Sequence, residues 1–158
     1  MPHPEIGEKA PSFALPGHDG KTHTLEELLD GTRALVIFFY PKDETPGCTA
    51  EACSFRDIHA ELAAAGARVV GVSSDPPDAH AAFREHHDLH YLLLSDEDGA
   101  VRRAYGVRPT LGLLPGRETF VIDADGVVRA RFRSQLRTRA HAREAMSTVR
   151  MLVGEDGN

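Results

Sequence analysis

Residues 34–66 read ALVIFFYPKDETPGCTAEACSFRDIHAELAAAG, and this stretch decides the fold. Its first seven residues are all apolar and Pro41 closes them, which is typical of a strand buried on both faces of a sheet. The part that follows predicts a helix of roughly five turns. Thr45 can cap this helix, Pro46 suits its first position, and Gly66 follows its last alanine as a stop. The chain therefore contains a buried central strand that runs directly into a long helix.

The same alternation of strand and helix continues toward the C-terminus. The further predicted elements are strands over residues 68–73, 91–95, 119–123 and 127–132, and helices over 76–87 and 138–153. The last two strands flank an Ala-Asp-Gly turn and read as a hairpin, and a smaller hairpin is expected from residues 12–15 and 21–24. This pattern predicts an α/β fold with a central mixed sheet flanked by helices.

Length and composition limit the possible functions. With 158 residues, of which 41% are hydrophobic, the chain suits one domain spanning residues 1–158. The net charge of -6 argues against a nucleic-acid partner, and seven arginines between residues 129 and 150 read as a solvated surface. No run of 18 apolar residues and no signal-peptide pattern is present, so we expect a cytoplasmic protein without a membrane partner.

The two cysteines, Cys48 and Cys53, are the first candidates for chemistry. Such a pair in a reducing compartment is more often metal-binding, catalytic or redox-sensing than structural. Cys48 falls in the first turn of the long helix, where unpaired N–H groups and the helix dipole favour a thiolate. It also lies on the apolar stripe that faces the sheet. Cys48 is therefore expected to be a nucleophile in a pocket.

Cys53 cannot reach Cys48 while the helix is intact. A spacing of five residues rotates it by about 140° and separates the two Cα atoms by about 8 to 9 Å. A disulfide needs less than about 7 Å. A bond between these cysteines therefore requires local unwinding of the helix.

The segment PKDETPGCTAEACSFRD resembles the active-site signature of the peroxiredoxins, thiol peroxidases of the thioredoxin-like fold. Their Pro-x-x-x-Thr-x-x-Cys motif is present as Pro41, Thr45 and Cys48, and Cys53 resembles the second cysteine of the bacterioferritin-comigratory, or Q-type, branch. Arg117, just before the TFVID strand, matches the arginine that the family uses. The N-terminal Gly-x-x-Ala-Pro-x-Phe piece appears as Gly7, Ala10, Pro11 and Phe13.

Peroxide reduction asks a thiolate to attack one oxygen while negative charge develops on the other. Arg117 and the Thr45 hydroxyl can hold the two oxygens, and Pro41 can shield the sulfur from water. A more acidic thiol is also a weaker nucleophile, so acidity alone brings little gain. Donors that stabilise the developing charge must supply the larger share. Arg117 and Thr45 are therefore expected to matter beyond thiolate formation.

The resemblance implies a cycle without metal or organic cofactor. Cys48 becomes a sulfenic acid, Cys53 closes a disulfide with it, and a dithiol donor, thioredoxin or a relative, reduces that disulfide. Hydrogen peroxide or an organic hydroperoxide is the implied substrate, and the Q-type branch suggests a monomer. A non-enzymatic redox sensor or holdase that exposes a surface when the helix unwinds remains the alternative. A disulfide reductase is disfavoured because its Cys-x-x-Cys pair is absent.

The sequence allows more than one interpretation of three further features. Glu51 either orients an arginine near Cys48 or compensates the helix dipole. The apolar loop over residues 107–115 either forms a collar for organic hydroperoxides or caps the core. Nine histidines raise the question of a metal, but His86 and His90 have no evident third ligand in the sequence, and we expect no metal site there.

Overall fold

The computed structural model describes residues 4–108 and 116–154. In chain order its elements are β1 (Ala14–Pro16), β2 (Thr22–Thr24), α1 (Leu25–Leu29), β3 (Ala34–Phe39), α2 (Pro46–Ala64), β4 (Ala67–Ser73), α3 (Pro77–His86), β5 (Leu92–Ser95), α4 (Ala100–Ala104), β6 (Glu118–Asp123), β7 (Val128–Arg133), α5 (Ala140–Val149) and a π-helix (Arg150–Gly154). Each predicted strand and helix is present with slightly different ends, and α1 and α4 are additional. The 107–115 loop lies, apart from its first two residues, outside the described part of the chain.

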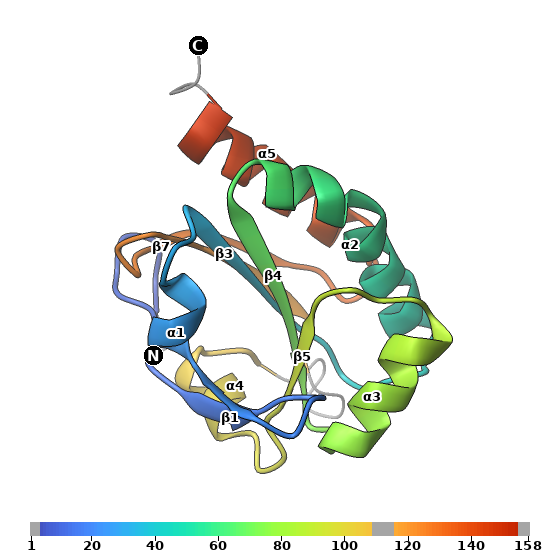
Figure 1. The fold of residues 1–158 in the computed structure, drawn as a ribbon. Coiled ribbons are helices and arrows are strands. Elements are labelled where there is room, and N and C mark those ends of the chain that lie inside the picture. The colour runs from blue at the N-terminus through green and yellow to red at the C-terminus, as the bar shows by residue number, and fades with distance from the viewer. Residues whose placement is uncertain (1–3, 109–115, 155–158) are drawn as a thin grey trace.

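Five strands form a mixed sheet in the order β5-β4-β3-β6-β7, with β3 at its centre as predicted. β3 pairs with β4 in parallel and with β6 antiparallel (Figure 1). In the second pairing Phe39 lies opposite Glu118. The carboxyl end of β3 and the amino end of β6 therefore lie side by side at the same end of the sheet, although they are far apart in sequence.

Helices α2 and α5 cover one face of the sheet, and α1, α4 and the β1–β2 hairpin cover the other (Figure 1). All six residues of β3 are fully buried because both faces are covered. Val36 and Phe38 enter the core beneath α2 and α5, and Leu35 and Ile37 enter the opposite core. Phe38 stacks on Phe55 of α2 with ring centroids 4.4 Å apart. This contact seats the long helix on the central strand.

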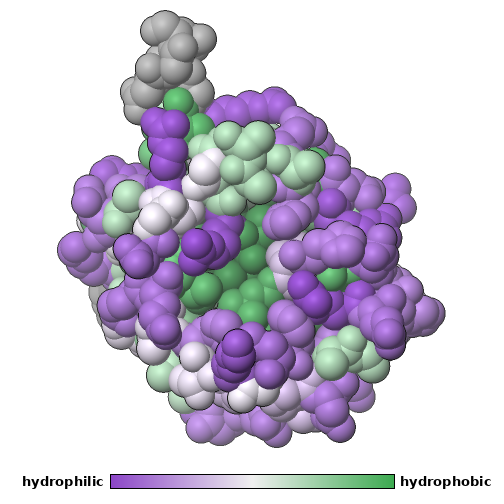
Figure 2. All heavy atoms as spheres, viewed as in Figure 1, coloured by the Kyte–Doolittle hydropathy of each residue, from purple (hydrophilic) through white to green (hydrophobic). Residues whose placement is uncertain are grey.

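The surface seen in Figure 2 is mostly hydrophilic around a patch of apolar residues at its centre. Large apolar side chains that are exposed among the described residues are Ile6, Leu136 and Met151. Within residues 4–108 and 116–154, no helix has both the length and the apolarity needed to span a membrane.

Candidate active site

Cys48 lies in the first turn of α2, immediately beyond the carboxyl end of the central strand. The side chain is buried, with an exposed fraction of only 1%. Its sulfur accepts the backbone N–H of Lys42 and the Nη1–H of Arg117, each at 3.5 Å. A negative charge on this sulfur therefore faces a peptide dipole, a guanidinium and the amino end of a helix.

Arg117 reaches Cys48 because the register of β3 and β6 brings its strand to the same edge of the sheet. Its Nη1 also lies 2.6 Å from Oε1 of Glu51, one turn further along α2. Both side chains are buried. Of the two readings of Glu51, the structure shows the one in which it orients the arginine.

Glu51 and Arg117 are both ionisable and both buried, and each shifts the pKa of the other. Burial raises the pKa of Glu51 to about 8, against the lowering effect of the Arg117 charge. Burial lowers the pKa of Arg117, but Glu51 and the nearby Cys48 raise it overall. Arg117 is therefore a permanent cation beside the sulfur. A Cβ at Gly47 would lie 3.2 Å from its Nη2, so a glycine suits the position beside the guanidinium.

Thr45 is the N-cap residue of α2 but makes no capping hydrogen bond with its side chain. This corrects the expected use of its hydroxyl as a cap. The hydroxyl donates instead to the carbonyl oxygen of Lys42 at 2.8 Å. Because the N–H of Lys42 points at the Cys48 sulfur, Thr45 helps to hold the backbone that carries this donor. Pro41 lies half-buried between the end of β3 and Lys42.

Arg102 of α4 is a residue that the sequence did not single out. Its Nη2 donates to the carbonyl oxygen of Tyr40 at 2.8 Å, and its Nη1 donates to that of Gly116 at 2.7 Å. These carbonyls belong to the residues just before Pro41 and Arg117. Arg102 thus joins the two segments that form the site, and no motif in the sequence marks it among the arginines.

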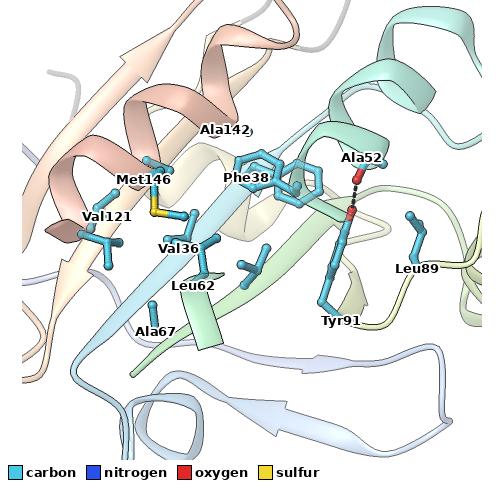
Figure 3. Packing of buried hydrophobic residues seen from close by; sticks show 14 of the residues in the cluster. Val36, Phe38, Ala52, Leu62, Ala67, Leu89, Tyr91, Val121, Ala142 and Met146 are labelled. Atoms are coloured by element: carbon cyan, nitrogen blue, oxygen red, sulfur yellow. Dashed lines mark hydrogen bonds between the residues drawn. The ribbon is translucent and has the colours of Figure 1, made fainter. Parts of the chain in front are cut away.

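Cys48 and Cys53 are both free thiols, and α2 is continuous from Pro46 to Ala64, as predicted for the reduced pair. Cys53 is half-buried. The hydroxyl of Tyr91 donates to the carbonyl oxygen of Ala52 at 2.7 Å, next to Cys53 (Figure 3). Unwinding of α2 between the cysteines must therefore proceed against this attachment to the sheet.

His141 of α5 is buried behind the Arg117–Glu51 pair. Its Nε2 donates to the carbonyl oxygen of Ser134 at 2.8 Å, and its Nδ1 lies 2.7 Å from the hydroxyl of Thr119. Burial lowers the pKa of His141 to about 4, helped by the charge of Arg117 and opposed by the hydrogen bond to Ser134. The ring is therefore neutral at pH 7, and its Nδ1 accepts the hydroxyl of Thr119.

We expect His141 to make the protein sensitive to acid. In the unfolded chain His141 takes up a proton with an ordinary pKa near 6.5, whereas in the folded protein its pKa is about 4. Stability is thus fully present above pH 6.5 and falls toward pH 4, by up to about 3 kcal/mol from this residue. Urea unfolding of His141→Gln should show a shallower decline over this range than the wild type. An exposed control, His90→Gln, should keep the wild-type slope; equal slopes for all three would contradict the assignment.

The loop after β3 is anchored by a buried polar cluster. His80 Nδ1 lies 2.7 Å from Oδ2 of Asp43, and the hydroxyl of Tyr40 donates to Oδ1 at 2.6 Å. The backbone N–H of Asp43 donates to Asp75 at 2.8 Å. Asp43, Asp75 and His80 have the spacing of metal ligands. Both ring nitrogens of His80 are engaged, with Asp43 and with the carbonyl oxygen of Leu94, and the side chains of His80 and Asp43 are closed to solvent. The cluster therefore fits a structural anchor of the active-site loop better than a metal centre.

A groove of about 700 Å³ runs between α2 and α5 and is lined in part by Asp57, Arg143 and Met146. Its lining includes neither cysteine and not Arg117. This groove is therefore separate from the buried side chains of Cys48 and Arg117.

Comparisons with known proteins agree with this arrangement. Residues 6–131 match the AhpC/TSA family. The chain is 43% identical over 147 residues to the chloroplastic peroxiredoxin Q of Populus jackii, which covers 92% of this chain and 68% of that protein. It is 42% identical over 147 residues to peroxiredoxin Q of Suaeda salsa, with the same coverage.

Solved structures show the same relationship. Peroxidoxin BcpB of Mycobacterium tuberculosis has a TM-score of 0.86 and 42% identity, covering 94% of this chain and 98% of that one. Peroxiredoxin Q of Xanthomonas campestris has a TM-score of 0.80 and 32% identity, covering 88% and 90%. The predicted thioredoxin-like α/β fold is thereby confirmed. The chain belongs to the AhpC/TSA family and, within it, to the Q-type, or bacterioferritin-comigratory, peroxiredoxins.

Proposed function

We propose that this chain reduces hydrogen peroxide and organic hydroperoxides with Cys48 as the nucleophile. The observation that carries the proposal is the buried Cys48 sulfur 3.5 Å from the Arg117 guanidinium. The thiolate takes one peroxide oxygen, the O–O bond breaks, and the other oxygen leaves as water or an alcohol after taking up a proton. The guanidinium stabilises the charge that develops on these oxygens. Thr45 and Pro41 shape the loop that brings them to the sulfur.

The second step closes a disulfide. After the start of α2 unwinds, the Cys53 thiol attacks the Cys48 sulfenic acid, and water leaves. A dithiol reductant, thioredoxin or a relative, then takes over the disulfide and returns both cysteines to thiols. The bacterioferritin comigratory protein of Xanthomonas campestris, studied for alkyl peroxide reduction, supports an organic hydroperoxide as one substrate. A monomeric, cytoplasmic enzyme remains our prediction.

Mass spectrometry after one equivalent of hydrogen peroxide tests both steps. We expect the wild type to lose about 2 Da and Cys53→Ser to retain a gain of about 16 Da at Cys48. A Cys48→Ser variant, the matched control, should show neither change. An unmodified Cys48 in the wild type would contradict the first step, and a persistent gain of about 16 Da in the wild type would contradict the second.

Turnover distinguishes the enzyme from a redox sensor or holdase. With a thioredoxin system present, an enzyme consumes many equivalents of peroxide for each chain. A pure sensor is oxidised once and then stops.

A further inference from the structure

A cluster of two histidines and one glutamate joins the active-site loop to the end of α3. Oε2 of Glu44, in the loop between β3 and α2, lies 3.0 Å from Nδ1 of His86. Its Oε1 lies 2.8 Å from Nε2 of His87. Glu44 supplies the third ligand that the sequence did not reveal. His90, which the sequence places four residues after His86, lies 3.1 Å from Asp88 and is not part of the cluster.

Several contacts orient these ligands before any ion binds. The backbone of Glu44 has a φ of 64°, a left-handed conformation that is uncommon outside glycine. The ring of His87 packs edge-on against Phe83 with centroids 5.1 Å apart. The carbonyl oxygen of His87 accepts Arg56 Nη1 of α2 at 3.0 Å. The neighbouring Asp43 is fixed by its buried contact with His80.

The chemistry of this set suits a zinc ion. Two imidazole nitrogens and a carboxylate oxygen are the ligands of open zinc sites, which add water as a fourth ligand. The three ligand atoms lie within 4.8 Å of one another. Around a tetrahedral zinc with bonds of about 2.0 to 2.1 Å, ligand atoms are separated by about 3.3 Å. Oε1 of Glu44 lies 3.1 Å from Nδ1 of His86 and 2.8 Å from Nε2 of His87, so both contacts need to open by only a few tenths of an ångström, and the two histidine nitrogens lie within 4.8 Å of each other.

The site is also accessible. The side chains of Glu44 and His86 are 45% and 66% exposed, whereas that of His87 is 19% exposed. An ion can therefore enter from solvent and keep a water ligand. The less exposed ring of His87, packed against Phe83, is the more firmly held of the two histidine ligands.

We propose that Glu44, His86 and His87 form a zinc-binding site that fastens the active-site loop to α3. Glu44 immediately precedes Thr45, the N-cap of α2, and lies four residues before Cys48. A metal bond at this point opposes displacement of the loop and the first turn of α2. Zinc therefore slows formation of the Cys48–Cys53 disulfide while leaving the folded pocket intact. This second effect rests on the proposed function, whereas zinc binding itself does not.

The binding test uses the Cys48→Ser/Cys53→Ser variant, because thiolates also bind zinc. Titration against a chromogenic zinc chelator should give one site per chain. Adding Glu44→Ala or His86→Ala should weaken binding by at least about 10- to 100-fold, the loss typical of disturbing even the outer contacts of a metal site. His90→Ala, an exposed histidine of the same segment, is the matched control and should bind like its parent.

Three further measurements complete this binding test. Cobalt in place of zinc should give the visible absorption of a tetrahedral site in the parent and not in His86→Ala, and magnesium, which prefers six oxygen ligands, should not compete. Circular dichroism checks that each variant is folded. Absence of zinc binding in the thiol-free parent would overturn the site, as would unchanged affinity after Glu44→Ala and His86→Ala. In that case the cluster is a set of hydrogen bonds only.

The kinetic test uses chains that retain both cysteines. After one equivalent of hydrogen peroxide, zinc should slow disulfide formation in the wild type by about fivefold or more, the size of a modest coupling between sites. It should leave the rate in His86→Ala nearly unchanged. Equal slowing in both proteins would assign the effect to zinc on the thiols and overturn the fastening of the loop. If metal-free wild type forms no disulfide, the proposed resolving step fails, while the binding result stands independently.

Discussion

Replacing Arg117 by alanine should lower the rate constant for oxidation of Cys48 by hydrogen peroxide by about 100- to 1,000-fold. The guanidinium is buried, carries a permanent charge and lies 3.5 Å from the sulfur, so its loss removes the donor closest to the developing charge. The loss should persist at high pH, where the thiol is already ionised. Stopped-flow measurement of single-turnover oxidation across pH gives the rate constant directly.

Arg117→Lys separates this effect from a defect in folding. Lysine retains a positive charge for Glu51 but lacks the planar group that contacts Glu51 and Cys48 together. We expect near-normal unfolding and a reduced rate. Full activity of Arg117→Ala at high pH would show that the arginine acts only through the thiolate and would sink the charge-stabilisation argument.

Replacing Glu51 by alanine should lower the free energy of unfolding by about 3 kcal/mol, because the buried Arg117 guanidinium then loses the carboxyl oxygen that accepts its hydrogen bond. The two side chains are 0% and 5% exposed, and Glu51 Oε1 lies 2.6 Å from Arg117 Nη1. The same helix offers a control in Glu61, which pairs with Arg150 at 3.0 Å with both side chains at least 60% exposed. Glu61→Ala should cost less than about 1 kcal/mol.

Urea unfolding of the two variants under one set of conditions makes the comparison. Peroxide reduction by Glu51→Ala should also fall, since Arg117 loses the contact that aims it at Cys48. Equal losses in the free energy of unfolding for Glu51→Ala and Glu61→Ala would show that the buried contact contributes no more to stability than the exposed one.

The central strand and α2 are predictable because local sequence determines them. β3 is apolar at every position and is buried at every position, and Pro46 and Gly66 lie where the helix begins and just beyond where it ends. The position of Cys48 follows from the same local pattern. Its burial beneath the sheet edge follows from the apolar stripe of α2.

Contacts between distant segments were harder to predict. The sequence places Arg117 just before a strand, but only the pairing of Phe39 with Glu118 brings that strand beside β3. Glu44 and His86 are 42 residues apart, and their contact depends on how α3 is rotated over the loop. Arg102 acts through backbone carbonyls, which every residue carries, so no residue type reveals its partners. The Thr45 hydroxyl donates to the carbonyl oxygen of Lys42 and does not cap α2, because the backbone of the loop places that carbonyl within its reach.

The hydrogen bond from Tyr91 to the carbonyl oxygen of Ala52 bears on survival of the protein at high peroxide. Within the proposed cycle, a sulfenic acid at Cys48 has two fates: capture by Cys53, or attack by a second peroxide that leads to an irreversible acid. An attachment worth about 1 kcal/mol changes the waiting time before capture by about fivefold. The strength of this single bond therefore helps to set the peroxide concentration at which the protein begins to inactivate itself.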